Sequence, residues 1–173
     1  MEKLMALMTE IEQKMNNTER KINEKFMHVQ QGSTICYFTH SIIINQEPNN
    51  SHLILASFHV MNETSFPFHE PIILLHLDSD GDIDFSGKYT VEGSTNTRVK
   101  APWVRVLLED HDPQTHYCFK PTTTNLIAPK SGVSFQNFQI KLPFNQYVNV
   151  NGYYYCEEQK EGIASLNTLQ INH

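Results

Sequence analysis

Charge, basic clusters and long apolar runs are scarce in this sequence of 173 residues. Charged residues make up 18% of it, and 13 Lys and Arg stand against 19 Asp and Glu, a formal net charge of −6. Residues 1–31 hold five basic and five acidic side chains, so the whole deficit falls on residues 32–173. An acidic chain without a Lys/Arg cluster binds a phosphate backbone poorly, so no nucleic-acid partner is expected. No run approaches the ~20 apolar residues of a membrane span, so no membrane partner is expected either.

Catalytic signatures and paired cysteines are missing as well. The sequence holds no G-x-S-x-G turn and no Gly-rich phosphate loop, so we expect a non-enzymatic protein without a cofactor. Cys36, Cys118 and Cys156 are an odd number and form no C-x-x-C pair. The N-terminus lacks a cationic start followed by an apolar run, which predicts a cytoplasmic protein with reduced thiols. A phage particle is the alternative location, because virion proteins also lack such signals.

The first pattern that is present is helical and covers residues 1–31. Apolar residues recur at alternating steps of four and three, which gives one apolar seam along a helix and is typical of a coiled coil. No Gly or Pro occurs before Gly32, a residue type that often ends a helix. The seam residues are Leu4, Met8, Ile11, Met15, Ile22 and Val29, with Thr18 and Lys25 as weaker members.

Such a seam is buried only against another helix or a folded domain. We expect the segment to associate with copies of itself as a dimer or a trimer. The alternative is that it folds back onto its own β domain. The mass of the chain in solution separates the two.

From Thr34 onward the hydrophobic period changes to two, the period of a half-buried strand. Turn residues separate the segments and no helical stretch lies between them, which favours antiparallel sheets over βαβ units. We therefore expect a mainly β domain over residues 32–173, an antiparallel sandwich of eight or nine strands. The expected strands are Ile35–Asn45, His52–Asn62, Pro71–Asp78, Ile83–Val91, Thr97–Leu107, Thr115–Lys120, Val133–Leu142, Tyr147–Cys156 and Ile163–Ile171.

Three short stretches carry a resemblance to a known family. Residues 53–62, which end in Val60-Met61-Asn62, are followed by the alternating residues 72–77. The turn at residues 126–130 precedes the next long strand and has Lys130 where Gly is usual. Together these stretches resemble bacterial immunoglobulin-like domains. The resemblance implies an immunoglobulin-like β-sandwich used for binding or scaffolding, and it carries over no site residues.

Two groups of residues are candidates for metal ligands. Asp78, Asp80 and Asp82 alternate along the chain and offer the oxygen ligands that Ca²⁺ prefers, although their spacing is not that of an EF-hand. The simpler interpretation is a hairpin turn at this place. His116 and Cys118 share one face of a strand, so they offer two of the four ligands of Zn²⁺. A structural histidine beside a buried cysteine is the alternative.

Three consecutive tyrosines lie in the segment 147–156. Neighbouring strand residues face opposite ways, so Tyr153 and Tyr155 share one side and Tyr154 takes the other. If Tyr154 is in the core, its neighbours form an outward pair that suits ring stacking on a sugar or a protein contact. The alternative is that they only cover a sheet edge.

These features together predict a non-enzymatic structural or protein-interaction module, held as a homo-oligomer by its N-terminal helix. The low charge and the many Asn and Ile residues suggest a bacterial or phage origin. One alternative function is the carbohydrate- or host-surface-binding tip of a phage-type fibre. Another is a small metalloenzyme that uses the His/Cys face.

Overall fold

The structure is a computed structural model of the whole chain, and it describes residues 13–18, 34–47, 49–94 and 101–172. The chain forms two compact units, Met1–Ser33 and Thr34–His173. In the first unit, residues 13–18 are helical and the Met15 side chain is 59% exposed. Among the described residues, no helix is both long and apolar enough to cross a membrane. The other residues of the predicted seam, Leu4, Met8, Ile11, Ile22 and Val29, lie outside the described residues.

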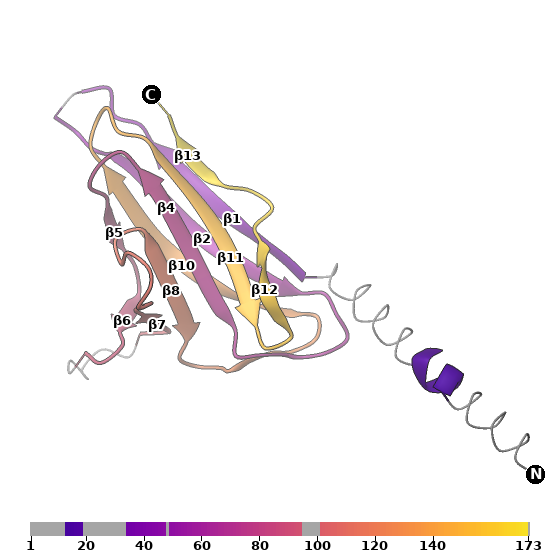
Figure 1. Cartoon of the computed structure of the whole chain (residues 1–173). Coiled ribbons are helices and arrows are strands. Elements are labelled where there is room, and N and C mark those ends of the chain that lie inside the picture. Colours follow the sequence, from indigo (N-terminus) through magenta and orange to yellow (C-terminus); the bar gives the residue numbers. More distant parts are fainter. Residues whose placement is uncertain (1–12, 19–33, 48, 95–100, 173) are drawn as a thin grey trace, which may run out of the picture. The chain divides into compact units, whose positions relative to one another are not determined.

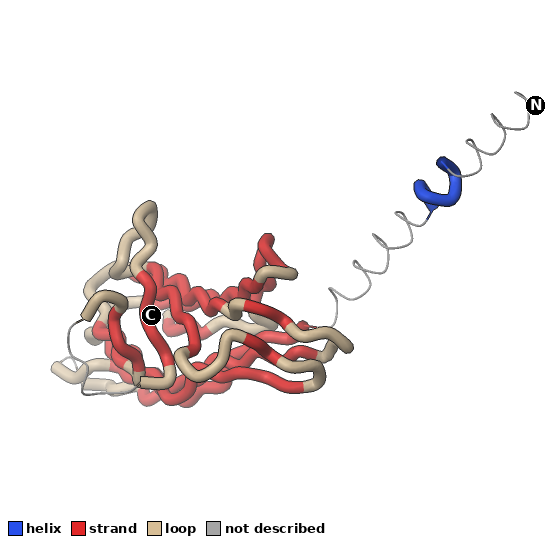
Figure 2. Tube along the Cα trace, turned by 90° about the horizontal axis from the view of Figure 1, so that it is seen from below, coloured by secondary structure: helices blue, strands red, loops and turns tan. Residues whose placement is uncertain are grey.

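The second unit is mainly β. Of the residues described in the whole chain, 57% are in strands and 4% in helix, and Figure 2 shows strands and loops throughout the described part of this unit. Two main sheets account for most of the strands (Figure 1). The smaller sheet has the order β1 (Thr34–Ile43), β2 (His52–Asn62), β10 (Ser131–Leu142) and β5 (Asp84–Ser86). The larger sheet has the order β12 (Gln159–Ala164), β11 (Val148–Cys156), β4 (Ile72–Ser79), β8 (His116–Pro121), β7 (Trp103–Val106) and β6 (Tyr89–Val91).

Three short strands complete the unit. β13 (Leu169–Ile171) pairs with the first residues of β11, whereas β12 pairs with its last residues. β3 (Phe68–His69) and β9 (Leu126–Ile127) form a separate two-stranded sheet. All described pairs are antiparallel except β6 with β7, which is parallel.

The buried faces of the two main sheets share one hydrophobic core. Phe119 of β8 in the larger sheet lies against Phe135 of β10 in the smaller sheet, with ring centroids 4.2 Å apart. Phe58 of β2 and Tyr154 of β11 are both fully buried in the same core. A Cβ atom on Gly152 would lie 2.2 Å from the Phe58 ring, so β11 and β2 approach more closely there than any side chain would allow.

A β-bulge in β10 allows two neighbouring aromatic side chains to face this core. Phe135 and Phe138 are three residues apart and would face opposite ways on a regular strand. The register of β10 against β2 shifts between them, and Asn137 takes a φ of 57°. Its backbone N–H donates to Ser57 Oγ at 3.1 Å, and both phenylalanines are fully buried. The extra residue therefore turns a second ring into the core.

The expectation of a mainly β unit with antiparallel sheets is confirmed, whereas the number of strands is wrong: the described residues form thirteen. The expected strand Ile83–Val91 is interrupted at residues 87–88, where the chain passes from the smaller sheet to the larger one. The expected strand Ile163–Ile171 is likewise interrupted between β12 and β13. β3 and β9 have two residues each, too few to show a hydrophobic period.

Asn62 is the buried polar centre that holds one end of the unit together. Its side-chain Nδ2 donates hydrogen bonds to the backbone carbonyl oxygens of Phe66, Ile127 and Ala128, at 2.7, 3.1 and 3.3 Å. Its Oδ1 accepts hydrogen bonds from the N–H and hydroxyl of Thr64 at 3.0 and 2.6 Å. Since Asn62 ends β2 and Ile127 ends β9, one side chain joins a strand, a loop and the small sheet.

We predict that Asn62→Asp lowers the free energy of unfolding by at least about 3 kcal/mol, because a buried carboxylate would face three carbonyl oxygens without an N–H to donate. The control is Asn151→Asp on the outward side of β11, which should change stability much less. Denaturant titration of both variants measures the difference. Equal stability of Asn62→Asp and the wild type would contradict this role of Asn62.

Candidate functional site

The outer face of the larger sheet presents the two tyrosines that the sequence singled out. β11 is buried at every second residue, and Tyr154 is fully buried in the core. Tyr153 and Tyr155 therefore lie on the opposite face of the sheet, where both are half-buried.

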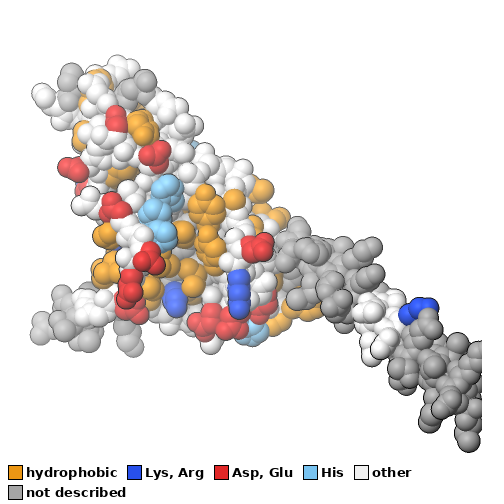
Figure 3. Space-filling view, in the orientation of Figure 1, with side chains coloured by type: hydrophobic (Ala, Val, Ile, Leu, Met, Phe, Trp, Pro, Cys, Tyr) orange, Lys and Arg blue, Asp and Glu red, His pale blue; other side chains and the backbone are white. Residues whose placement is uncertain are grey.

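Apolar side chains extend this face across the neighbouring strands. In register, Tyr155 pairs with Ile72 and Tyr153 with Leu74 of β4. Leu74 is in turn next to Cys118 of β8, and that residue is next to Val106 of β7. In Figure 3 the hydrophobic side chains and histidines form a central band on this face, with acidic side chains beside it. We call this band the outer patch, and it comprises Ile72, Leu74, Val104, Val106, Cys118, Tyr153 and Tyr155.

The ring of Tyr155 packs directly on the backbone of Gly162 in β12, a residue that has no side chain. A Cβ atom on Gly162 would lie 2.4 Å from Cε1 of Tyr155, so the ring covers the Gly162 backbone. Gly162 has a φ of 79°, a conformation that favours glycine. Tyr155 is therefore a fixed part of the outer patch.

Three histidines border the outer patch. His76 of β4 pairs in register with His116 of β8, and their ring centroids are 4.5 Å apart. His111 also stacks on His116, with ring centroids 4.6 Å apart and an interplanar angle of 14°. Burial, followed by the two neighbouring imidazoles, lowers the pKa of His116. A stack of imidazoles therefore disfavours protonation of its central member.

The predicted His116/Cys118 pair does share one face of β8, as alternate strand residues must. Cys118 is the most buried member of the outer patch, at 4% exposed, and desolvation by burial raises the pKa of its thiol. Among the described residues, this pair and the neighbouring histidines bring no three ligand atoms within 4.8 Å of one another. All three cysteines are free and buried.

Asp78, Asp80 and Asp82 lie at the turn after β4. Two of them accept hydrogen bonds from Tyr147. The Asp80 carboxylate accepts a hydrogen bond from the backbone N–H of Tyr147 at 2.9 Å. The Asp78 carboxylate accepts one from the Tyr147 hydroxyl at 3.3 Å and is the main cause of the raised pKa of that tyrosine. Asp82 lines a cavity of about 350 Å³ together with Gln114. Within the part of the chain that the structure describes, these carboxylates do not form a group of three close ligands.

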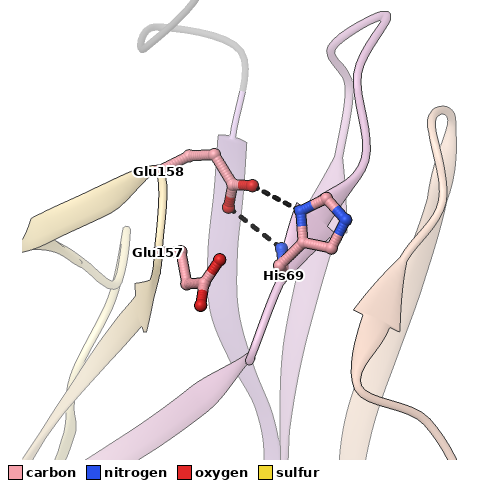
Figure 4. A group of neighbouring side chains, drawn as sticks. All are labelled: His69, Glu157 and Glu158. Carbon is pink, nitrogen blue, oxygen red and sulfur yellow. Dashed lines mark hydrogen bonds and ion pairs between the residues drawn. The ribbon is translucent and has the colours of Figure 1, made fainter.

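A group of potential ligands that the sequence did not indicate lies at the end of β3. A ring nitrogen of His69 and carboxylate oxygens of Glu157 and Glu158 all lie within 4.8 Å of one another. Glu158 Oε1 is 2.6 Å from Nδ1, and Oε2 accepts a hydrogen bond from the His69 backbone N–H at 2.9 Å. Figure 4 shows both carboxylates turned toward His69.

The electrostatics of this group follow from its geometry. The hydrogen bond to Glu158 is the main reason why the pKa of His69 is raised, with Glu157 and Glu70 adding to it. Partial burial opposes ionisation of Glu158, but the hydrogen bonds from His69 outweigh it, so the pKa of Glu158 is lowered. The pair is therefore stabilised in its charged form.

The sequence held no signal for this group. His69 and Glu158 are 89 residues apart and lie outside any motif. The contact between them depends on the pairing of the two-residue strands β3 and β9 and on the tight turn after β11. Neither feature has a hydrophobic period that a sequence could show.

No protein-family model matches the chain, and no curated protein matches it either.

We predict that the His69–Glu158 pair stabilises the fold fully between pH 4.5 and pH 6.5, the ordinary pKa values of the two groups. Because the pKa of His69 is raised, its contribution is lost as the pH rises from 6.5 through the folded-state value; because that of Glu158 is lowered, its contribution is lost as the pH falls below 4.5. His69→Asn keeps a donor but does not titrate, so its melting temperature should fall less than that of the wild type at alkaline pH. His40→Asn, at an exposed histidine of β1, is the control. Parallel pH profiles for the wild type and His69→Asn would rule out this linkage.

Proposed function

We propose that residues 34–172 form an immunoglobulin-like β-sandwich that acts as a non-enzymatic protein-interaction module, and that the outer patch is its binding surface. Three observations support the fold. The main sheets share one core, and Lys130, which stands where the resembling domains have Gly, takes the φ of 57° that favours Gly. Asn62 of the Val-x-Asn stretch is the buried hydrogen-bonding centre between β2 and β9.

The half-buried apolar and aromatic outer patch is the observation that carries the binding function. Aromatic side chains that lie on a rigid strand lose little conformational entropy on binding and are enriched at energetic centres of interfaces. The excess negative charge of the sequence falls on this unit, because residues 1–31 are neutral. We therefore propose a protein partner that presents an apolar surface flanked by Lys and Arg.

Selection of peptides from a random display library on the full-length chain tests this proposal. We predict selected peptides that combine aromatic or aliphatic residues with Lys or Arg, and whose affinity decreases as salt increases. Tyr153→Ala or Tyr155→Ala should cost about 2 kcal/mol of binding free energy. Tyr37→Ala, at a half-buried tyrosine on the outer face of the smaller sheet, should cost little. Binding that is equally strong in all three variants would place the interaction elsewhere.

A carbohydrate-binding surface is the second candidate, because Tyr153 and Tyr155 face outward from one strand. Pairs of exposed rings suit stacking on sugar rings. A glycan array distinguishes the two candidates with the same variants: glycan binding that is lost in Tyr153→Ala and kept in Tyr37→Ala would favour the sugar.

We further propose that the N-terminal segment joins several copies of this module, as a dimer or a trimer. Met15 of the predicted seam has an exposed side chain in the described helix. We predict that Met15→Glu lowers the mass of the full-length chain measured by light scattering, because a charge at the seam opposes association. Asn16→Glu, one residue away and also exposed, should leave the mass unchanged. A wild-type chain that stays monomeric at high concentration would end this proposal.

A further inference from the structure

The group at the end of β3 brings together an imidazole and two carboxylates from segments that are far apart in the chain. Their ligand atoms lie within 4.8 Å of one another, and all three side chains are accessible to solvent. Imidazole and carboxylate together are a donor set that Zn²⁺ accepts, whereas Ca²⁺ and Mg²⁺ prefer oxygen ligands alone.

Main-chain hydrogen bonds fix the arrangement. The Glu157 N–H donates to the His69 carbonyl at 3.0 Å, and the His69 N–H donates to Glu158 Oε2 at 2.9 Å. The strand end and the turn therefore hold each other in register. The three ligand atoms are positioned in advance, which lowers the entropy lost on binding an ion.

Glu157 is the member that a structural ion pair does not require. Its carboxylate accepts no hydrogen bond from any residue that the structure describes, although it lies beside His69 and Glu158. Two carboxylates next to one protonated imidazole leave an excess negative charge. A divalent cation beside a neutral imidazole would balance both carboxylates.

We propose that His69 Nδ1 and the carboxylates of Glu157 and Glu158 bind one divalent transition-metal ion of the zinc class, with water completing its coordination. The ion takes the position of the proton that His69 and Glu158 share, and this proton is released to solvent. Zinc affinity should therefore rise with pH.

Calorimetric titration of tag-free, full-length protein with zinc chloride tests the site. We expect one zinc ion per chain and a higher melting temperature in its presence. Glu157→Gln should weaken zinc binding at least about tenfold and lower the melting temperature of the metal-free protein only slightly. Glu161→Gln, which removes the same charge from an exposed position on β12, should bind zinc as the wild type does.

Three results would overturn the proposal: no zinc binding, zinc binding that Glu157→Gln leaves intact, or calcium and magnesium binding as tight as that of zinc. The variants leave the outer patch untouched. Failure of this site therefore does not affect the proposed binding function.

Discussion

The alternation of side chains along β11 determines where the chemistry of this unit can lie. Val150, Tyr154 and Cys156 are all buried on one side of the strand. A strand cannot bury them without turning Tyr153 and Tyr155 to the other side. If the register of β11 slipped by one residue, its core residues would be exposed and the hydroxyls of Tyr153 and Tyr155 would be buried. The packing of the core therefore also fixes the outward position of the two tyrosines.

The short distance between the two main sheets is a second constraint on the structure. Local departures from regular strand geometry make room for the core side chains between them. The core contains many rings, including those of Phe58, Phe119, Phe135 and Phe138. Gly152 gives Phe58 the room that a side chain would occupy. The bulge in β10 and the passage of the chain between β5 and β6 add rings to the core at the cost of regular pairing.

Features that follow from the hydrophobic period could be predicted from the sequence. Contacts between residues far apart in the chain could not. The two-residue period located most of the long strands, and the order of the tyrosines implied which of them face outward. It did not reveal the bulge, because Phe135 and Phe138 break the period in order to share the core. It did not reveal the His69–Glu158 pair either, since no local pattern links residues 89 positions apart. Lys130 lies between these two cases: the resemblance marked its position as one where Gly is usual, and Lys130 takes a φ of 57°, a conformation that favours Gly.

The two proposed surfaces are coupled through the same strand. Tyr154 lies between the outward tyrosines in the chain, and its hydroxyl is near Cys156 and Glu158. A change that repacks Tyr154 therefore acts on the outer patch through Tyr153 and Tyr155, and on the His69 group through the turn after Cys156. Substitutions in the core of β11 consequently cannot separate the two surfaces. Only outward side chains such as Tyr153 and turn side chains such as Glu157 can be changed without altering the packing that positions both.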